Sequence, residues 1–173
     1  MKLIIICALL FASSFSFADV EVGDVPPSYL GKNRDGVKVH LREMKGKVVV
    51  ATFWASWCPP CLKELPILES IQRQIGKDKL EIVAINYQED KKVFRKLKSQ
   101  MKKMEITITH DARGTISKRF GVDSLPHMFI IDPRGKVAKV HIGYGESSQQ
   151  KIVDELNELL TTDWGANEEA TGE

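Results

Sequence analysis

The sequence predicts a single α/β domain in which helices cover both faces of a sheet and an antiparallel hairpin closes it. Two continuous apolar runs, residues 48–54 and 80–87, are typical of strands buried on both faces. Each run is followed by apolar residues at helical spacing, over 62–75 and 93–101. This order of strand, helix, strand and helix favours parallel strands joined by helical crossovers.

Turn and capping residues mark the remaining elements. Asp35-Gly36 is a hairpin signal, Asp90 can cap the second helix, and Gly121 can end a short third helix. Pro66 interrupts the first helix and predicts a kink there. The further elements expected are a hairpin over 29–41, a helix over 115–120, a hairpin over 128–141 and a last helix ending at 160.

The two ends of the chain are expected to lie outside this domain. Lys2, an apolar stretch over 3–17 and the small residue Ala18 predict a secretory signal peptide over 1–18. The apolar stretch is shorter than the about 20 residues that a membrane-spanning helix needs, and a retained anchor is the alternative. The domain then covers 19–160, and 161–173 form a flexible acidic tail in which Trp164 has no evident partner.

Composition supports an ordinary globular protein and gives no case for nucleic acid as a partner. Hydrophobic residues make up 43% of the 173 residues and charged residues 28%, with a formal net charge of +2. The strongest local charge is a face rich in lysine and arginine on the helix near 91–103. We interpret it as a solvent-exposed helix face rather than a site for an acidic partner.

Only three cysteines occur, and their placement favours chemistry over a structural disulfide. Cys7 lies in the signal segment, which leaves Cys58 and Cys61 in the domain. Exported compartments tolerate disulfides, but two cysteines so close in sequence close too small a loop to stabilise a fold much. A domain of this size also buries enough surface to fold without such a bond. The pair is therefore predicted to be reactive.

The pair follows a buried strand and opens a helix, a position that suits thiol–disulfide exchange. Unpaired N–H groups and the helix dipole favour the thiolate of Cys58, the predicted attacking and more exposed thiol. Cys61 lies one turn further on the same face and would resolve the mixed disulfide. Pro59 and Pro60 can donate no N–H to the Cys58 sulfur, so its pKa should fall only modestly. That predicts a reducing pair rather than a strongly oxidising one.

Other functions for the two thiols are weaker. A zinc site needs about four ligands, and the four histidines are scattered without paired spacing. Covalent haem attachment needs a histidine after the second cysteine, and Leu62 stands there. A disulfide donor, a metal-handling binding module that uses the two cysteines, and a redox-inert adaptor remain as alternatives. No metal site and no cofactor beyond the cysteine pair are predicted.

The stretch from Phe53 to Cys61 resembles the active-site region of thioredoxin-fold proteins, and more narrowly of the exported TlpA/ResA-like (DsbE/CcmG-like) thiol–disulfide oxidoreductases. Gly46-Lys47 before the first buried strand, Pro66 after the cysteines and the 132–135 turn extend the resemblance over about 23–160. It implies a thioredoxin-like three-layer α/β/α domain with a mixed central sheet and an N-terminal β-hairpin extension. It also implies a redox-active Cys58–Cys61 disulfide.

The resemblance carries further residues into the site. Pro126 corresponds to the family's cis-proline, which faces the cysteine pair. Its neighbour Leu125 would offer backbone groups to a substrate strand. The residues expected to touch substrate are completed by Trp57, Pro59 and Pro60. Trp54 and Pro66 are expected to shape the site from beneath and beside it.

Three polar positions near the pair are assigned by the same comparison. Glu64 matches a glutamate found near the thiols in this group, and if buried its pKa would rise and it could exchange a proton with Cys61. Thioredoxin has a buried aspartate at the position of Thr52, so proton transfer here cannot use a carboxylate at that place. His127 follows the cis-proline and is expected to be a bystander, with tuning of Cys58 as the alternative.

The resemblance implies an exported enzyme, most simply in the periplasm. A membrane-anchored enzyme facing away from the cytoplasm is the alternative if the signal segment is retained. Its partners would be client proteins with disulfides or thiols, and an upstream membrane or exported thiol electron donor. In relatives the clients include apocytochromes in cytochrome c biogenesis.

Overall fold

A mixed five-stranded sheet forms the centre of the domain, with the strand order β5-β4-β3-β6-β7. The computed structural model describes residues 19–145 and 147–164, so the expected signal peptide and residues 165–173 lie outside the described residues. β3, β4 and β5 run parallel to one another, whereas β6 and β7 pair antiparallel. The five strands are β3 (Val48–Trp54), β4 (Leu80–Tyr87), β5 (Thr107–Asp111), β6 (His127–Ile131) and β7 (Val137–Ile142).

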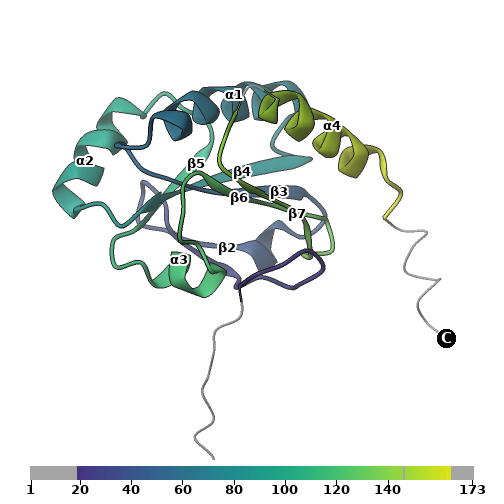
Figure 1. The fold of residues 1–173 in the computed structure, drawn as a ribbon, viewed down its shortest axis with the longest axis horizontal. Helices are drawn as coiled ribbons and strands as arrows, with labels where there is room; N and C mark the ends of the chain where they lie inside the picture. The colour runs from purple at the N-terminus through teal and green to yellow at the C-terminus, as the bar shows by residue number, and fades with distance from the viewer. Residues whose placement is uncertain (1–18, 146, 165–173) are drawn as a thin grey trace, which may run out of the picture.

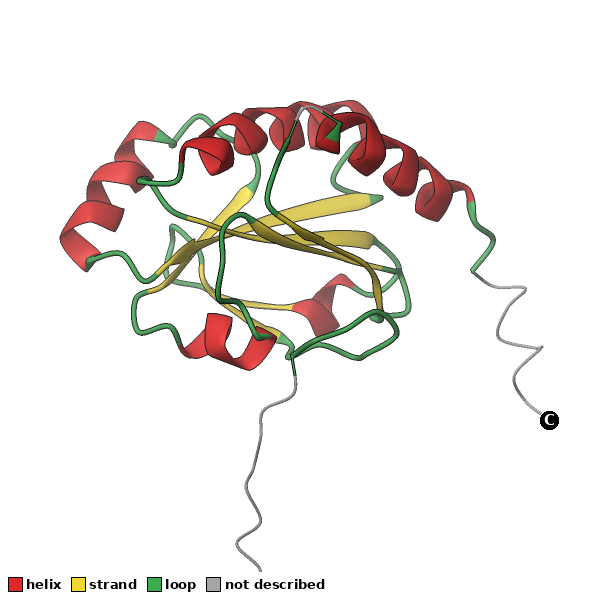
Figure 2. Cartoon of the chain, viewed as in Figure 1, coloured by secondary structure: helices red, strands yellow, loops and turns green. Residues whose placement is uncertain are grey.

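Helices cover both faces of this sheet, as Figures 1 and 2 show. α1, α2 and α4 lie on one face, and α3 lies on the other face together with a separate two-stranded hairpin. The expected three-layer arrangement with an N-terminal hairpin is therefore confirmed. The bounds are α1 (Pro59–Ile75), α2 (Lys91–Gln100), α3 (Thr115–Phe120), α4 (Ser148–Thr161), and in the hairpin layer β1 (Tyr29–Lys32), β2 (Lys38–His40) and the 3-10 helix η1 (Leu41–Met44).

Two apolar cores hold the three layers together, because successive strand residues point to opposite faces of a sheet. On β3, Val50 and Trp54 pack with α1 and α4. Val49 and Phe53 pack on the other face with α3 and the hairpin. Every residue of β3 is buried, which explains why its sequence is a continuous apolar run rather than an alternating one.

Strand β5 is missing from the sequence prediction, and the structure corrects this. It is an edge strand that pairs only with β4 in the described sheet, so two of its five residues can remain partly exposed. The signal that could have found it is the alternation of Ile106 and Ile108, both buried, with threonines. The Thr109 hydroxyl donates a 2.6 Å hydrogen bond to the Leu30 carbonyl and so ties β5 to the hairpin.

Trp164 has partners, contrary to the expectation from the sequence. Its indole N–H donates a 2.8 Å hydrogen bond to the Leu159 carbonyl. The guanidinium of Arg134 lies 4.7 Å from the centre of its ring, a cation–π contact. The chain just after α4 is therefore attached to the turn between β6 and β7.

None of the helices within 19–145 and 147–164 is long and apolar enough to cross a membrane.

Candidate active site

The cysteine pair lies where the buried strand β3 passes into helix α1. Cys58 is the N-cap residue of α1 in extended conformation, and Cys61 lies in the first helical turn. The two sulfurs form a disulfide, with Cα atoms 5.3 Å apart. Cys58 is 4% exposed and Cys61 1%, so the expected order of exposure is present but small in this oxidised state. A client must therefore reach Cys58 over the surface formed by its neighbours.

Two prolines decide which hydrogen bonds the Cys58 sulfur can receive. Pro59 and Pro60 occupy the first two helical positions and have no N–H group. The N–H of Cys61 donates to the Cys58 sulfur at 3.3 Å, and the N–H of Leu62 goes to the Cys58 carbonyl instead. An N-cap side chain ordinarily accepts from the second or third helical residue. Here the second helical residue is Pro60, so only the third, Cys61, has an N–H to donate.

Glu64 is a buried carboxyl one helical turn after Cys61. It is 2% exposed and accepts a 2.8 Å hydrogen bond from the hydroxyl of Thr52 on β3. Burial raises the pKa of Glu64 from 4.5 to about 7, and the hydrogen bond from Thr52 lowers it by less. The carboxyl can therefore give or take a proton near neutral pH, and Thr52 supports it from the position where thioredoxin has an aspartate.

The other wall of the site is the loop before β6. The peptide bond between Leu125 and Pro126 is cis, as the resemblance implied. Phe53 pairs with His127 in the antiparallel register of β3 and β6, so Pro126 lies level with the end of β3, where the cysteine segment begins. The Pro126 carbonyl accepts the Gly143 N–H at 2.8 Å, and the half-buried Leu125 lies next to it.

His127 faces away from the cysteine pair. Its ring stacks on Phe129, with centroids 4.8 Å apart, and Phe129 belongs to the core on the α3 face of the sheet. Cys58 and Cys61 belong to the core on the other face. Burial lowers the pKa of His127, an effect that Asp123 and Asp19 oppose. This placement favours the prediction that His127 is a bystander.

The two tryptophans of the segment have opposite exposures. Trp54 is buried beneath the site, whereas Trp57 is 64% exposed directly before Cys58. Trp54 also lines an apolar groove of about 420 Å³ between α1 and α2, together with Leu62 and Pro66. Pro66 lies inside α1, which continues through it. Trp57 and the exposed Pro59 are thus on the surface that a substrate would meet, and Trp54 and Pro66 support it.

The structure adds Glu89 to the site, a residue that sequence reasoning missed. Its carboxylate accepts the Ser56 N–H at 2.9 Å and also the Ser56 hydroxyl. It accepts the side-chain amide of Asn86 at 2.5 Å as well. Glu89 is 8% exposed, and it fixes the chain two residues before Cys58. The available signal was a pair of polar residues, Asn86 and Glu89, at the end of the apolar run of β4.

Metal ligands do not gather anywhere in the described residues. No group of three or more His, Cys, Asp or Glu residues there is placed to hold a metal ion. A metal-handling function would therefore have to rest on the two cysteines.

Comparison with known proteins identifies the family. The sequence profile of the Redoxin family matches residues 21–159. The chain belongs to the Redoxin family. This redoxin is 32% identical over 163 residues to the thiol-disulfide oxidoreductase ResA of Bacillus subtilis (strain 168), covering 90% of this chain and 87% of ResA. It is also 32% identical over 126 residues to the thioredoxin-like protein YneN of the same strain, covering 72% and 73% of the two chains.

A solved structure gives the same result for the fold. A DsbE-like thiol:disulfide interchange protein from Chlorobium tepidum superposes with a TM-score of 0.76 at 28% identity, covering 82% of this redoxin and 99% of that chain. The expected thioredoxin-like fold is confirmed. The redoxin is a thiol–disulfide oxidoreductase of the ResA/DsbE type with a Cys58–Cys61 pair, and its reaction partners carry thiols or disulfides.

Proposed function

We propose that this redoxin is an exported reductant that opens disulfides in client proteins with Cys58 and Cys61. The observation that carries the proposal is the hydrogen bonding of the Cys58 sulfur. Prolines fill the two helix positions before Cys61, and the Cys61 N–H is the one donor to that sulfur in the described part of the chain. Fewer donors stabilise the thiolate less, and a less stabilised reduced form makes the pair a better reductant.

The reaction begins with the reduced protein. The Cys58 thiolate attacks one sulfur of the client disulfide, that S–S bond breaks, and the leaving client thiolate takes a proton from water. Cys61 then gives its proton to Glu64 and attacks the Cys58 sulfur. The mixed disulfide breaks, the second client thiolate leaves, and the Cys58–Cys61 bond seen in the structure forms. Two electrons have passed to the client, and an upstream thiol donor restores them.

Glu64 is the proton acceptor in this scheme. Cys61 and Glu64 lie one helical turn apart on α1, and both are closed off from solvent. A carboxyl with a pKa of about 7 is matched to a proton transfer near neutral pH, because it is present in both forms there. The substrate strand would lie along Leu125 and Pro126, with Trp57, Pro59 and Pro60 on the other side.

Export and client identity extend the proposal. The signal-like segment over 1–18 supports delivery to the periplasm, and a retained segment would anchor the same domain facing away from the cytoplasm. The resemblance to ResA-like proteins supports apocytochromes in cytochrome c biogenesis as one client class. Cell fractionation tests the first point, and reduction of a disulfide-bonded apocytochrome by the purified protein tests the second.

The deciding experiment is the reduction potential of the chain from residue 19 onward, equilibrated in graded thiol–disulfide buffers. A reductant should lie near the value of thioredoxin, about −270 mV, and far from the strong oxidant DsbA at about −120 mV. A value near −120 mV would show a disulfide donor and overturn the proposal. Cys58→Ser is the companion variant. An adaptor function would survive this substitution, whereas reduction of clients would be lost.

A further inference from the structure

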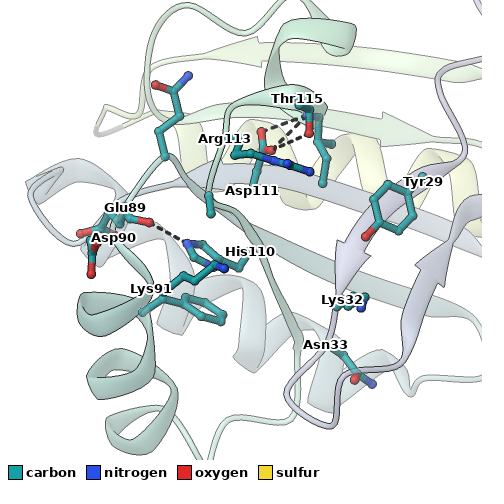
Figure 3. A pocket seen from close by; sticks show the side chains of 14 residues that line it. Tyr29, Lys32, Asn33, Glu89, Asp90, Lys91, His110, Asp111, Arg113 and Thr115 are labelled. Atoms are coloured by element: carbon teal, nitrogen blue, oxygen red, sulfur yellow. Dashed lines mark hydrogen bonds between the residues drawn. The ribbon is translucent and has the colours of Figure 1, made fainter.

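A second hollow lies on the same edge of the sheet as the cysteine pair. It is a surface pocket of about 930 Å³ at the carboxyl ends of β4 and β5, bounded by β1 and by the first residues of α2 and α3. Figure 3 shows side chains from β1, β5, the loop after β4 and the starts of α2 and α3 around it. Neither cysteine lines the pocket, so it is distinct from the reaction centre.

The three carboxylates that line this pocket are all engaged by the protein itself. Glu89 accepts hydrogen bonds from Ser56 and Asn86. Asp90 accepts the Lys92 N–H at 2.6 Å at the start of α2. Asp111 accepts the N–H groups of the residues that begin α3, at 2.8 to 3.1 Å. Oxygens of all three carboxylates are thus occupied by neutral donors of the protein, although the carboxylates keep their negative charge.

The cations of the pocket, in contrast, are unmatched. Lys32 comes from β1, Lys91 from α2 and Arg113 from the loop between β5 and α3, and all three line the same pocket. Within 19–145 and 147–164 none of them forms an ion pair or a side-chain hydrogen bond. Three positive side chains from three segments therefore line one hollow, and none of them is paired with the three carboxylates that share it. Each of these unpaired cations can bind a carboxylate that a client brings to the pocket.

Strand register places this pocket close to the reaction centre. Trp54 at the end of β3 is level with Asn86 on β4, and Asn86 is level with His110 on β5. Neighbouring strands lie about 4.8 Å apart, so the pocket begins about 10 Å from the end of β3.

Glu89 connects the two regions. Its carboxylate holds Ser56, two residues before Cys58, and its carbonyl accepts a 2.7 Å hydrogen bond from His110, which lines the pocket. These hydrogen bonds join the segment before Cys58 to the rim of the pocket, and a client chain bound over Cys58 can extend along them into the pocket.

We infer that this pocket binds acidic side chains of the client while the client's disulfide reacts at Cys58. The inference rests on the proposed function and adds a substrate preference to it. An extended chain advances about 3.3 Å per residue, so acidic residues three to five positions from the reacting cysteine would reach the pocket. Of the basic residues of α2, only Lys91 lines the pocket. Lys92, Arg95 and Lys96 are exposed, and Lys98 is half-buried and donates a hydrogen bond to the Arg34 carbonyl.

The test uses three peptides of equal length that each contain one disulfide and differ only at the flanking positions. These positions carry Glu, Gln or Lys, three to five residues on either side of the cysteines. Stopped-flow measurement gives the rate constant for oxidation of the reduced protein by each peptide. At low ionic strength the Glu peptide should react about tenfold faster than the Gln peptide, and the Lys peptide should be the slowest. The Glu/Gln ratio should approach one in high salt.

Substitutions separate the pocket from the general charge of α2. Arg113→Gln and Lys91→Gln should each lower the Glu/Gln ratio about threefold. Lys96→Gln is the matched control, because it removes the same charge from an exposed residue of α2 outside the pocket. It should leave the ratio unchanged. An equal loss in Lys96→Gln would overturn the pocket as the binding site.

The outcomes also separate this inference from the proposed function. Reaction of all three peptides at one rate, at every salt concentration, overturns the acidic preference while the reductase function stands. Failure of the reduced wild-type protein to react with any of the peptides overturns the proposed function and the inference with it. A faster reaction of the Lys peptide overturns the inference alone.

Discussion

The Thr52 hydroxyl donates a 2.8 Å hydrogen bond to the carboxylate of Glu64, and both side chains are closed off from solvent. The bond joins the centre of β3 to the helix that carries the cysteine pair. Burial outweighs it and raises the pKa of Glu64 to about 7. This carboxyl therefore changes its protonation state in the pH range in which thiols are exchanged.

The first prediction concerns stability against pH. The folded protein holds the Glu64 proton more tightly than the unfolded chain, because the pKa is about 7 in the folded state and near 4.5 otherwise. The contribution of Glu64 to the free energy of unfolding is therefore largest below about pH 4.5. As the pH rises through 7, about 3 kcal/mol of this free energy is lost. Urea unfolding of oxidised wild-type protein and of Glu64→Gln at pH 5 and pH 8 measures it.

The comparison of the two proteins isolates this carboxyl. Titration of other groups, His127 among them, is common to wild type and Glu64→Gln and cancels in the difference. The stability of the variant relative to wild type should rise between pH 5 and pH 8. A difference that does not change with pH would assign the titration to another group.

The second prediction concerns the step in which Cys61 resolves the mixed disulfide. Because Glu64 accepts the Cys61 proton in the proposed scheme, Glu64→Gln should slow this step about 10²-fold near pH 8. The wild-type rate should also fall as pH drops below about 7, and the variant should lack that inflection. Release of client from a preformed mixed disulfide at Cys58 measures the step. Identical pH profiles for the two proteins would remove Glu64 from the mechanism.

The third prediction adds a hydrogen-bond donor at the Cys58 sulfur. Pro60→Ala restores an N–H at the second helical position, from which an N-cap side chain can accept. A hydrogen bond to a charged group contributes about 1.5–3 kcal/mol, which corresponds to about 30–60 mV for a two-electron couple. The pair should become more oxidising by that amount, and the pKa of Cys58, from alkylation rates, should fall.

Pro59→Ala is the matched control for this change. It makes the same substitution at the first helical position, whose N–H is not one that an N-cap side chain usually accepts. Its potential should stay close to that of wild type. Equal shifts in both variants would mean that loss of proline rigidity, rather than the new donor, sets the potential.

The fourth prediction concerns Glu89, a positioning residue that acts through Ser56. Glu89→Ala leaves the partly buried Ser56 N–H and the buried Asn86 amide without their acceptor, which should cost about 2–3 kcal/mol of stability. Loosening of the segment before Cys58 should also shift the reduction potential. Glu89→Gln keeps an acceptor oxygen and should recover part of both effects.

An exposed acidic residue provides the reference for these measurements. Glu43→Ala removes one negative charge from η1, where no hydrogen bond or ion pair of that side chain is present in the described structure. It should leave the stability and the potential unchanged. If the Glu89→Ala protein keeps the wild-type reduction potential, Glu89 has only a structural role.

Local pattern was sufficient for most of the elements. The apolar runs of β3 and β4 identified buried strands, because residues covered on both faces are apolar at every position. Asp90 marks the start of α2, because its side chain accepts a hydrogen bond from the Lys92 N–H. Gly121 marks the end of α3, because a residue without a side chain readily adopts the left-handed conformation found there. Strand β5 was missed, because an edge strand needs fewer apolar residues and its pairing partner is distant in sequence.

The sequence by itself determined the chemistry of this protein, since two cysteines, two prolines and a helix start are neighbours along the chain and act on one another locally. Tertiary structure decided what surrounds that chemistry. The burial that shifts Glu64, the hold of Glu89 on Ser56 and the convergence of Lys32, Lys91 and Arg113 all depend on strand order and on the packing of separate segments. Desolvation and charge convergence are properties of the space around a residue, and that space is filled by residues far away in the chain.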